Sequence, residues 1–173
     1  HSIRRRQRQM CIRDRPIDTG VTSLRGLSPQ RNRFELEYAL ERGSTANSFL
    51  FEEGADCPAV LVHPPGSAYS SVFLPALAEL LPDPTRPLLV VVGHVNPNRV
   101  ALLHDLASTY PQLELITSTA GAKLLEELWS QRKPSAPGET QEAPQLPPIP
   151  SLQVIRQEQS LPLSHQRSLC LLY

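Results

Sequence analysis

Residues 88–99 read LLVVVGHVNPNR, a run of five apolar residues followed by a glycine, a histidine and further polar side chains. The run 88–92 has the length and composition of a fully buried strand. His94 stands just past the end of that strand, with polar residues at every second position after it. Asn96 can cap a helix, and Pro97 is favoured at a first helical position. The stretch therefore fits either an ordinary helix start or a strand end at which a histidine begins a metal site.

Strands and helices alternate on both sides of this stretch. After it, apolar residues recur at helical spacing over 100–110 and 120–128, with a short strand at Leu113–Ile116 between them. Before it, Ala59–Val62 is an apolar strand, and 72–81 has the period of an amphipathic helix. This order predicts an α/β fold with helices on at least one face of a sheet and parallel pairing in its second half.

The first part of the chain has a different pattern. Phe34–Tyr38 alternates apolar and polar residues, and Asn47–Phe51 is expected to pair back with it through a turn in which Gly43 is free to adopt a positive φ. Residues 16–33 look polar and irregular. Ala59–Val62 would then be the third strand of a meander, ending at His63, where two prolines stop the ladder.

The last part begins with a proline-rich segment. Residues 133–150 hold six prolines among Ser, Gly, Glu and Gln, which predicts an exposed extended loop. Beyond this loop, 152–155 and 161–163 are expected to form a new hairpin. The apolar strands 59–62 and 88–92 would then lack a cover on one face, because only the start of a second sheet follows them.

Both ends of the chain resemble translated sequencing-adapter sequence. Residues 5–15 read RRQRQMCIRDR, and the last four residues can be decoded from the opposite strand of the same adapter. We interpret 1–15 and 170–173 as non-native and 16–169 as one partial domain that includes the loop 133–150. The alternative for the N-terminal segment is a basic arm that binds nucleic acid or a membrane.

Composition excludes several classes of protein. The chain has 17 basic and 17 acidic residues, but without residues 1–15 there remain 11 basic and 16 acidic ones, which argues against a nucleic-acid footprint. Outside the two end segments Cys57 is the only cysteine, so neither an internal disulfide nor a cysteine metal cluster is expected. No apolar run approaches the roughly 20 residues that span a bilayer. No glycine-rich phosphate loop marks a flavin or nicotinamide site.

In order and spacing, residues 20–169 resemble the diiron domain of flavodiiron proteins, in the multidomain form of oxygenic phototrophs. The resemblance rests on RFELEYALERGSTANSFLF, AVLVHPPGSAYSSVFLPAL and LLVVVGHVNPNRVALLHDLASTYPQLELITSTAGAKLLEELW. It implies a metallo-β-lactamase-like αββα sandwich, incomplete on the C-terminal side. The loop at 133–150 looks like an insertion.

The resemblance also implies that this chain has lost metal ligands. In the catalytic members the motif is H-x-E-x-D-H, and its charged and imidazole side chains hold two irons. His94 keeps the first position, whereas Asn96, Asn98 and Arg99 stand where Glu, Asp and His would be. Neutral amides and a guanidinium without a donor lone pair are poor replacements for such ligands. We therefore expect no metal and no catalytic residue here, and we expect Arg99 to fill the space of a metal and to pair with a carboxylate from the missing half of the domain.

The remaining histidines do not restore a site. For His63 a solvent-facing loop residue is favoured over a stray ligand. His104 is expected on the polar side of its helix, and His165 in the last hairpin. The zinc motif H-x-H-x-D-H of metallo-β-lactamase-like hydrolases fits only at His94, so a hydrolase ranks last among the functions.

Two functions rank above it. The first is a piece of a flavodiiron-type oxidoreductase, whose resembled parent uses FMN, NAD(P)H and a diiron domain to reduce oxygen to water. The second is a non-catalytic partner subunit that regulates an active homologue. Both imply a cytoplasmic homo- or hetero-oligomer with another flavodiiron subunit and no activity of this piece alone.

Overall fold

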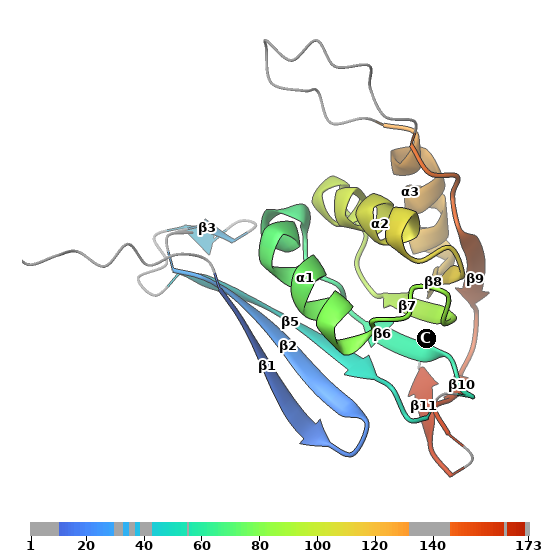
Figure 1. The fold of residues 1–173 in the computed structure, drawn as a ribbon. Coiled ribbons are helices and arrows are strands. Elements are labelled where there is room, and N and C mark those ends of the chain that lie inside the picture. Colours follow the sequence, from blue (N-terminus) through green and yellow to red (C-terminus); the bar gives the residue numbers. More distant parts are fainter. Residues whose placement is uncertain are drawn as a thin grey trace, which may run out of the picture.

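The computed structural model describes residues 11–29, 33–34, 37–38, 43–54, 56–131, 146–164 and 166–171. In these residues a seven-stranded mixed sheet carries three helices on one face and a two-stranded hairpin on the other (Figure 1). The sheet strands, in chain order, are β1 (Cys11–Asp18), β2 (Val21–Ser28), β5 (Ser44–Phe51), β6 (Ala59–Val62), β7 (Leu88–Val92), β8 (Leu113–Ser118) and β9 (Ser151–Ile155). The helical elements are η1 (Ser67–Tyr69), α1 (Ser70–Leu80), α2 (Pro97–Thr109) and α3 (Thr119–Trp129). The short pairs are β3 (Arg33–Phe34) with β4 (Glu37–Tyr38), and β10 (Gln159–Pro162) with β11 (Ser168–Leu171).

The second half of the main sheet has the predicted α/β architecture. The sheet order is β1-β2-β5-β6-β7-β8-β9, and strands β6 to β9 pair in parallel. The expected strands at 59–62, 88–92 and 113–116 are confirmed, as are the three expected helices. Each helix returns the chain to the same end of the sheet, so the carboxyl ends of the parallel strands meet at one edge.

The helices bury one face of the sheet. Phe73 and Leu77 of α1, together with Leu103 and Leu106 of α2, are almost completely buried against it, and Leu125 of α3 extends the same core. These positions recur at helical spacing, which is why the helices could be predicted. Because the strands and helices bury apolar side chains, polar functional side chains are expected in the loops at the strand ends.

The predicted irregular segment at 16–33 is wrong, because β2 lies inside the main sheet. On its buried face β2 carries Thr22, Leu24, Gly26 and Ser28, of which only leucine is large and apolar. A Cβ on Gly26 would lie 2.6 Å from Cδ1 of Tyr69, so the aromatic ring fills the space that an apolar side chain of β2 would otherwise take. The strand therefore has almost no hydrophobic period to detect.

The predicted pairing of the first strands is also wrong. Strand β5 pairs with β2 and β6, not with the segment at 33–38, whose short strands β3 and β4 pair with each other. The expected positive φ at Gly43, directly before β5, is confirmed at 76°. Residues Cys11–Arg15 lie in the edge strand β1, and Cys170 and Leu171 lie in β11.

The C-terminal part corrects two further expectations. Strand β9 does not form a hairpin with 161–163, because it pairs in parallel with β8 as the last strand of the main sheet. The new hairpin is β10–β11, and Leu161 and Leu163 pack with Val60, Val91 and Ile116 in a second core. The apolar face of β6 and β7 thus has a cover, contrary to the expectation of an open face. The open part lies further along the sheet, where Phe49 is 37 % and Ile17 is 56 % exposed.

Arg167 links the β10–β11 hairpin to the main sheet. Arg167 Nε donates to Glu53 Oε2 at 2.8 Å, and its Nη1 donates to Asp18 Oδ2 at 2.9 Å. Arg167 holds the pKa of the Asp18 carboxyl below its usual value, although the hydrogen bond from the Thr19 backbone is the larger cause. The hairpin and the turn between β1 and β2 are therefore joined by charge-assisted hydrogen bonds.

The described end of the proline-rich segment is extended. Residues 146–150 are neither helix nor strand and lead directly into β9, while 132–145 fall outside the described residues. Trp129 Nε1, at the end of α3, donates to Pro147 O at 2.9 Å. No helix among the described residues is long and apolar enough to cross a membrane.

Candidate metal centre

The candidate site lies at the carboxyl ends of the parallel strands β6 and β7. In open α/β sheets this edge is where ligands bind, because the loops that leave adjacent strands converge there. His63 follows β6, and its backbone N–H donates to Val91 O at 3.0 Å. The His63 carbonyl accepts from Ser48 Oγ at 2.8 Å, and His63 has φ 58°, a left-handed conformation that is uncommon for a residue other than glycine. The loop after β6 is thus held by hydrogen bonds in a constrained turn.

Asn96 acts as the cap of α2, as the sequence predicted. Its Oδ1 accepts a hydrogen bond from Arg99 N at 2.9 Å, and Pro97 occupies the first turn. A side-chain oxygen in this position satisfies one of the free N–H groups at the helix start. The oxygen that would stand in place of a carboxylate ligand is therefore used by the helix itself.

The four motif positions differ sharply in burial. His94 and Asn98 are exposed and Asn96 is half-buried, whereas Arg99 is only 9 % exposed. Asn98 Cβ lies 3.5 Å from the place of a Cβ on Gly66, in the loop after β6. The structure thus brings the motif next to the β6 loop, but its buried member is the cation.

Arg99 joins the two strand-end loops. Its Nε donates to Pro64 O at 2.7 Å, and its Nη1 donates to His94 O. Its Nη2 lies 3.3 Å from His63 Nε2. Because a guanidinium can only donate, this last contact requires a neutral His63 that carries its proton on Nδ1.

The electrostatics of the loop agree with a neutral imidazole. Partial burial lowers the pKa of His63 below its ordinary value, and the charges of Arg99 and His94 lower it further. His63 remains exposed on one side, as expected for a loop histidine, yet its ring also contacts the buried cation. No sequence pattern predicts this contact, because the two residues lie 36 positions apart in the chain.

These residues do not fit a diiron centre. Among the described residues, no three His, Cys, Asp or Glu side chains come together as a metal would require. The guanidinium lies between the two loops that would frame the metals, and at an effective dielectric of 20 a unit charge 4 Å away is worth roughly 4 kcal/mol. Ordinary iron binding therefore conflicts with both the ligand set and the charge.

His104 lies away from this site, and the two remaining histidines of the chain fall outside the described residues. His104 is half-buried and not on a fully polar helix face, because its ring meets that of Trp129 edge-on with centroids 4.4 Å apart. Burial lowers the pKa of His104, and its Nε2 has no hydrogen-bond partner. His165 falls outside the described residues.

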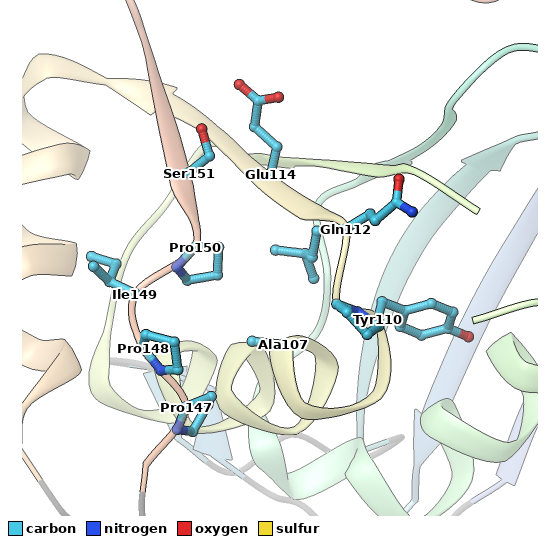
Figure 2. A pocket seen from close by; sticks show the side chains of 11 residues that line it. Ala107, Tyr110, Gln112, Glu114, Pro147, Pro148, Ile149, Pro150 and Ser151 are labelled. Atoms are coloured by element: carbon cyan, nitrogen blue, oxygen red, sulfur yellow. The ribbon is translucent and has the colours of Figure 1, made fainter. Parts of the chain in front are cut away.

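A pocket lies at the opposite ends of the parallel strands. Its volume is about 320 Å³, and Figure 2 shows it between the start of β8 and the segment that leads into β9. Tyr110, Gln112 and Glu114 line one side, and residues 147–151 line the other. Its one carboxylate, Glu114, lies at the opposite end of the strands from residues 94–99, so the pocket adds no metal ligand to the motif.

Comparison with known proteins identifies the fold and its relatives. No family model matches the chain. The chain is 43 % identical over 107 residues to diflavin flavoprotein A 6 of Nostoc sp., covering 62 % of this chain and 18 % of that protein. It is 38 % identical over 129 residues to diflavin flavoprotein A 3 of Synechocystis sp., covering 75 % of this chain and 20 % of that protein. The chain thus spans about a fifth of the length of the curated relatives that it matches.

Solved structures lead to the same conclusion. The metal-soaked Flv1 flavodiiron core of Synechocystis sp. superposes with a TM-score of 0.76 and 30 % identity, covering 93 % of this chain and 36 % of that one. The flavoprotein of Thermotoga maritima, at 20 % identity and a TM-score of 0.68, covers 88 % of this chain and 34 % of that one, and it shows a likeness of fold. The chain therefore belongs to the flavodiiron protein family and carries part of a metallo-β-lactamase-like domain of the diflavin flavoprotein A type.

Proposed function

We propose that this chain is part of a ligand-altered flavodiiron subunit that acts beside a ligand-complete homologue. The whole protein would be an oxidoreductase in which NAD(P)H and FMN supply electrons for the reduction of oxygen to water. This subunit would not carry out the metal chemistry itself, and it would work in the cytoplasm, where NAD(P)H is available. The observation that carries the proposal is the buried Arg99, whose guanidinium lies where a metal site would need anionic or imidazole ligands.

The non-catalytic partner remains the second candidate. It differs from the first only in whether electrons pass through this subunit. Asn96 supports this candidate, because its side-chain oxygen Oδ1 accepts the hydrogen bond that caps α2 and is therefore not directed to a metal. A metallo-β-lactamase-like hydrolase gains no support, since only His94 fits its motif.

The metal content of the chain tests the proposal. The 173-residue chain should be incubated with ferrous iron without oxygen, desalted and measured by elemental analysis, with the Thermotoga maritima flavoprotein treated in parallel. We expect iron at background level in this chain. Close to two irons per chain would contradict a ligand-altered site.

The partner is tested separately with the complete gene. Co-expression with a ligand-complete diflavin flavoprotein should give a complex that co-purifies and consumes oxygen with NAD(P)H. A complete protein that consumes oxygen alone, at the same rate as the ligand-complete homologue, would contradict the proposed division of roles.

A further inference from the structure

One side chain connects three points at the carboxyl edge of the sheet. Arg99 begins in the first turn of α2, and its guanidinium reaches a carbonyl after β6, a carbonyl after β7 and the His63 ring. The two carbonyls are uncharged acceptors, and the His63 ring is a third when it is neutral. The guanidinium thus acts as a shared donor for backbone groups that the strands leave unpaired at their ends.

The burial of this cation makes the arrangement demanding. Arg99 is 9 % exposed, and its bond to Pro64 O is buried. A buried carbonyl that loses its donor is not easily satisfied by water. The rigid planar fork of a guanidinium can serve several acceptors at once, which the point charge of a lysine cannot do in the same way.

The helix cap is part of the same arrangement. Asn96 Oδ1 accepts from the backbone N–H of Arg99, while the side chain of Arg99 returns to the carbonyl of His94. Two of the three altered motif positions thus support each other: one positions the backbone of Arg99, and its guanidinium holds the loop that precedes the cap.

We propose that Arg99 is a built-in structural cation that takes over the organising role of metal at this edge of the sheet. The proposal rests on the proposed function, because it assumes that no metal binds here. The guanidinium crosslinks the loops after β6 and β7, so the local fold does not depend on any metal ion. Arg99 is a positioning residue and not a catalytic one.

Chemical rescue tests this role in the full 173-residue chain. In Arg99→Ala the melting temperature should fall by about 5–10 °C, because the buried Pro64 carbonyl loses its donor. Methylguanidinium, at concentrations far below those that denature proteins, should restore part of that loss. Methylammonium should not restore it, because it lacks the planar fork, and ferrous iron should not restore it either. Removal of metal by EDTA should leave the wild-type melting temperature unchanged.

Arg86→Ala is the matched control. Arg86 also donates to backbone carbonyls, of Gly54 and Cys57, but it is half-exposed. We expect a smaller fall in melting temperature and no response to methylguanidinium. Equal falls in the two variants without any specific rescue, or a wild type destabilised by EDTA, would overturn the proposal.

A measurement on the wild type covers the case in which Arg99→Ala does not fold. Nitrogen-15 NMR should show an Nε–H signal of Arg99 that exchanges with solvent at least tenfold more slowly than that of Arg86, as expected for a buried bond. Equal exchange would overturn the proposal. Iron in the wild type would instead refute the proposed function, and a metal-free wild type with a dispensable Arg99 would refute only this inference.

Discussion

Two arginines hold the loops at opposite ends of strand β6, and they do so with the same chemistry. Arg86, just before β7, donates to Cys57 O at 3.1 Å and to Gly54 O, and so fixes the loop that precedes β6. Arg99, after β7, donates to Pro64 O at 2.7 Å and fixes the loop that follows β6. Each guanidinium thus donates hydrogen bonds to backbone carbonyls beyond one end of β6, where pairing with a neighbouring strand stops.

The two ends differ in their access to water. Arg86 is half-exposed, so water can take its place at the carbonyls if its side chain is lost. Arg99 is almost fully buried, and so is its hydrogen bond to Pro64 O, where water does not readily replace the guanidinium. The comparison teaches that losing a hydrogen bond to a carbonyl destabilises the fold mainly where water cannot take the place of the lost donor. It also shows that the motif at residues 94–99 lies near the end of β6 that is buried, where water does not readily replace the guanidinium.

The largest expected effect separates the two arginines directly. Arg99→Met should lower the free energy of unfolding by about 2–3 kcal/mol, because it leaves the buried Pro64 carbonyl without its charged donor. Arg86→Met should lower it by about 1 kcal/mol. Urea denaturation followed by circular dichroism measures both values on the same chain. Equal losses would show that burial does not distinguish the two ends.

The next effect tests whether the helix cap belongs to the Arg99 end. Asn96→Ala should cost about 1 kcal/mol, because the first turn of α2 loses its side-chain acceptor. In a double-mutant cycle with Arg99→Met the two losses should not add, since one residue positions the other. The same cycle with Arg86→Met should be additive. Additivity in both cycles would contradict the coupling between cap and guanidinium.

The smallest effect concerns pH and also falls on one end only. Burial lowers the pKa of His63 in the folded chain, so the unfolded chain binds more protons around and below the ordinary histidine pKa of about 6.5. The stability due to neutral His63 is therefore complete above that pH and is lost as the pH falls towards the lower folded pKa. His63→Asn should flatten this decrease, because asparagine tolerates the left-handed backbone and does not titrate.

Arg86→Met provides the control for this slope. It should keep the pH dependence of the wild type, because Arg86 donates to the carbonyls of Gly54 and Cys57, which do not titrate. The dependence of melting temperature on pH should be measured for the wild type, His63→Asn and Arg86→Met between about pH 5 and pH 8, which spans roughly one to two units on either side of an ordinary histidine pKa. An unchanged slope in His63→Asn would assign the acid sensitivity to another group.

The comparison also shows where reasoning from sequence succeeded. The parallel strands at 88–92 and 113–116 are continuous apolar runs, and the helices between them carry apolar residues at a period of 3.6. Burial on both faces leaves such strands no other composition. Asn96 followed by Pro97 has the local chemistry of a helix start, and the structure has the cap there. These features depend on neighbours in sequence, so a pattern can reveal them.

Other parts of the fold left no local pattern. Strand β2 buries small and polar residues because the ring of Tyr69, roughly 40 positions further along the chain, fills the space above Gly26. Strand β9 resembles a hairpin strand by composition, and only its parallel pairing with β8 places it in the main sheet. The cover of β6 and β7 by Leu161 and Leu163 is likewise a matter of tertiary packing.

By itself the sequence determined the α/β order, the resemblance to the flavodiiron domain and the neutral or cationic residue types at Asn96, Asn98 and Arg99, because residue type decides what can hold a metal. Only the tertiary structure decided what surrounds the Arg99 guanidinium. The loops after β6 and β7 lie far apart in the chain and meet because their strands pair in parallel. That meeting buries the Arg99 guanidinium among the carbonyls of Pro64 and His94. A cation that would be solvated on an isolated helix thus becomes the link between two strand ends, since burial removes the water that would otherwise compete for it.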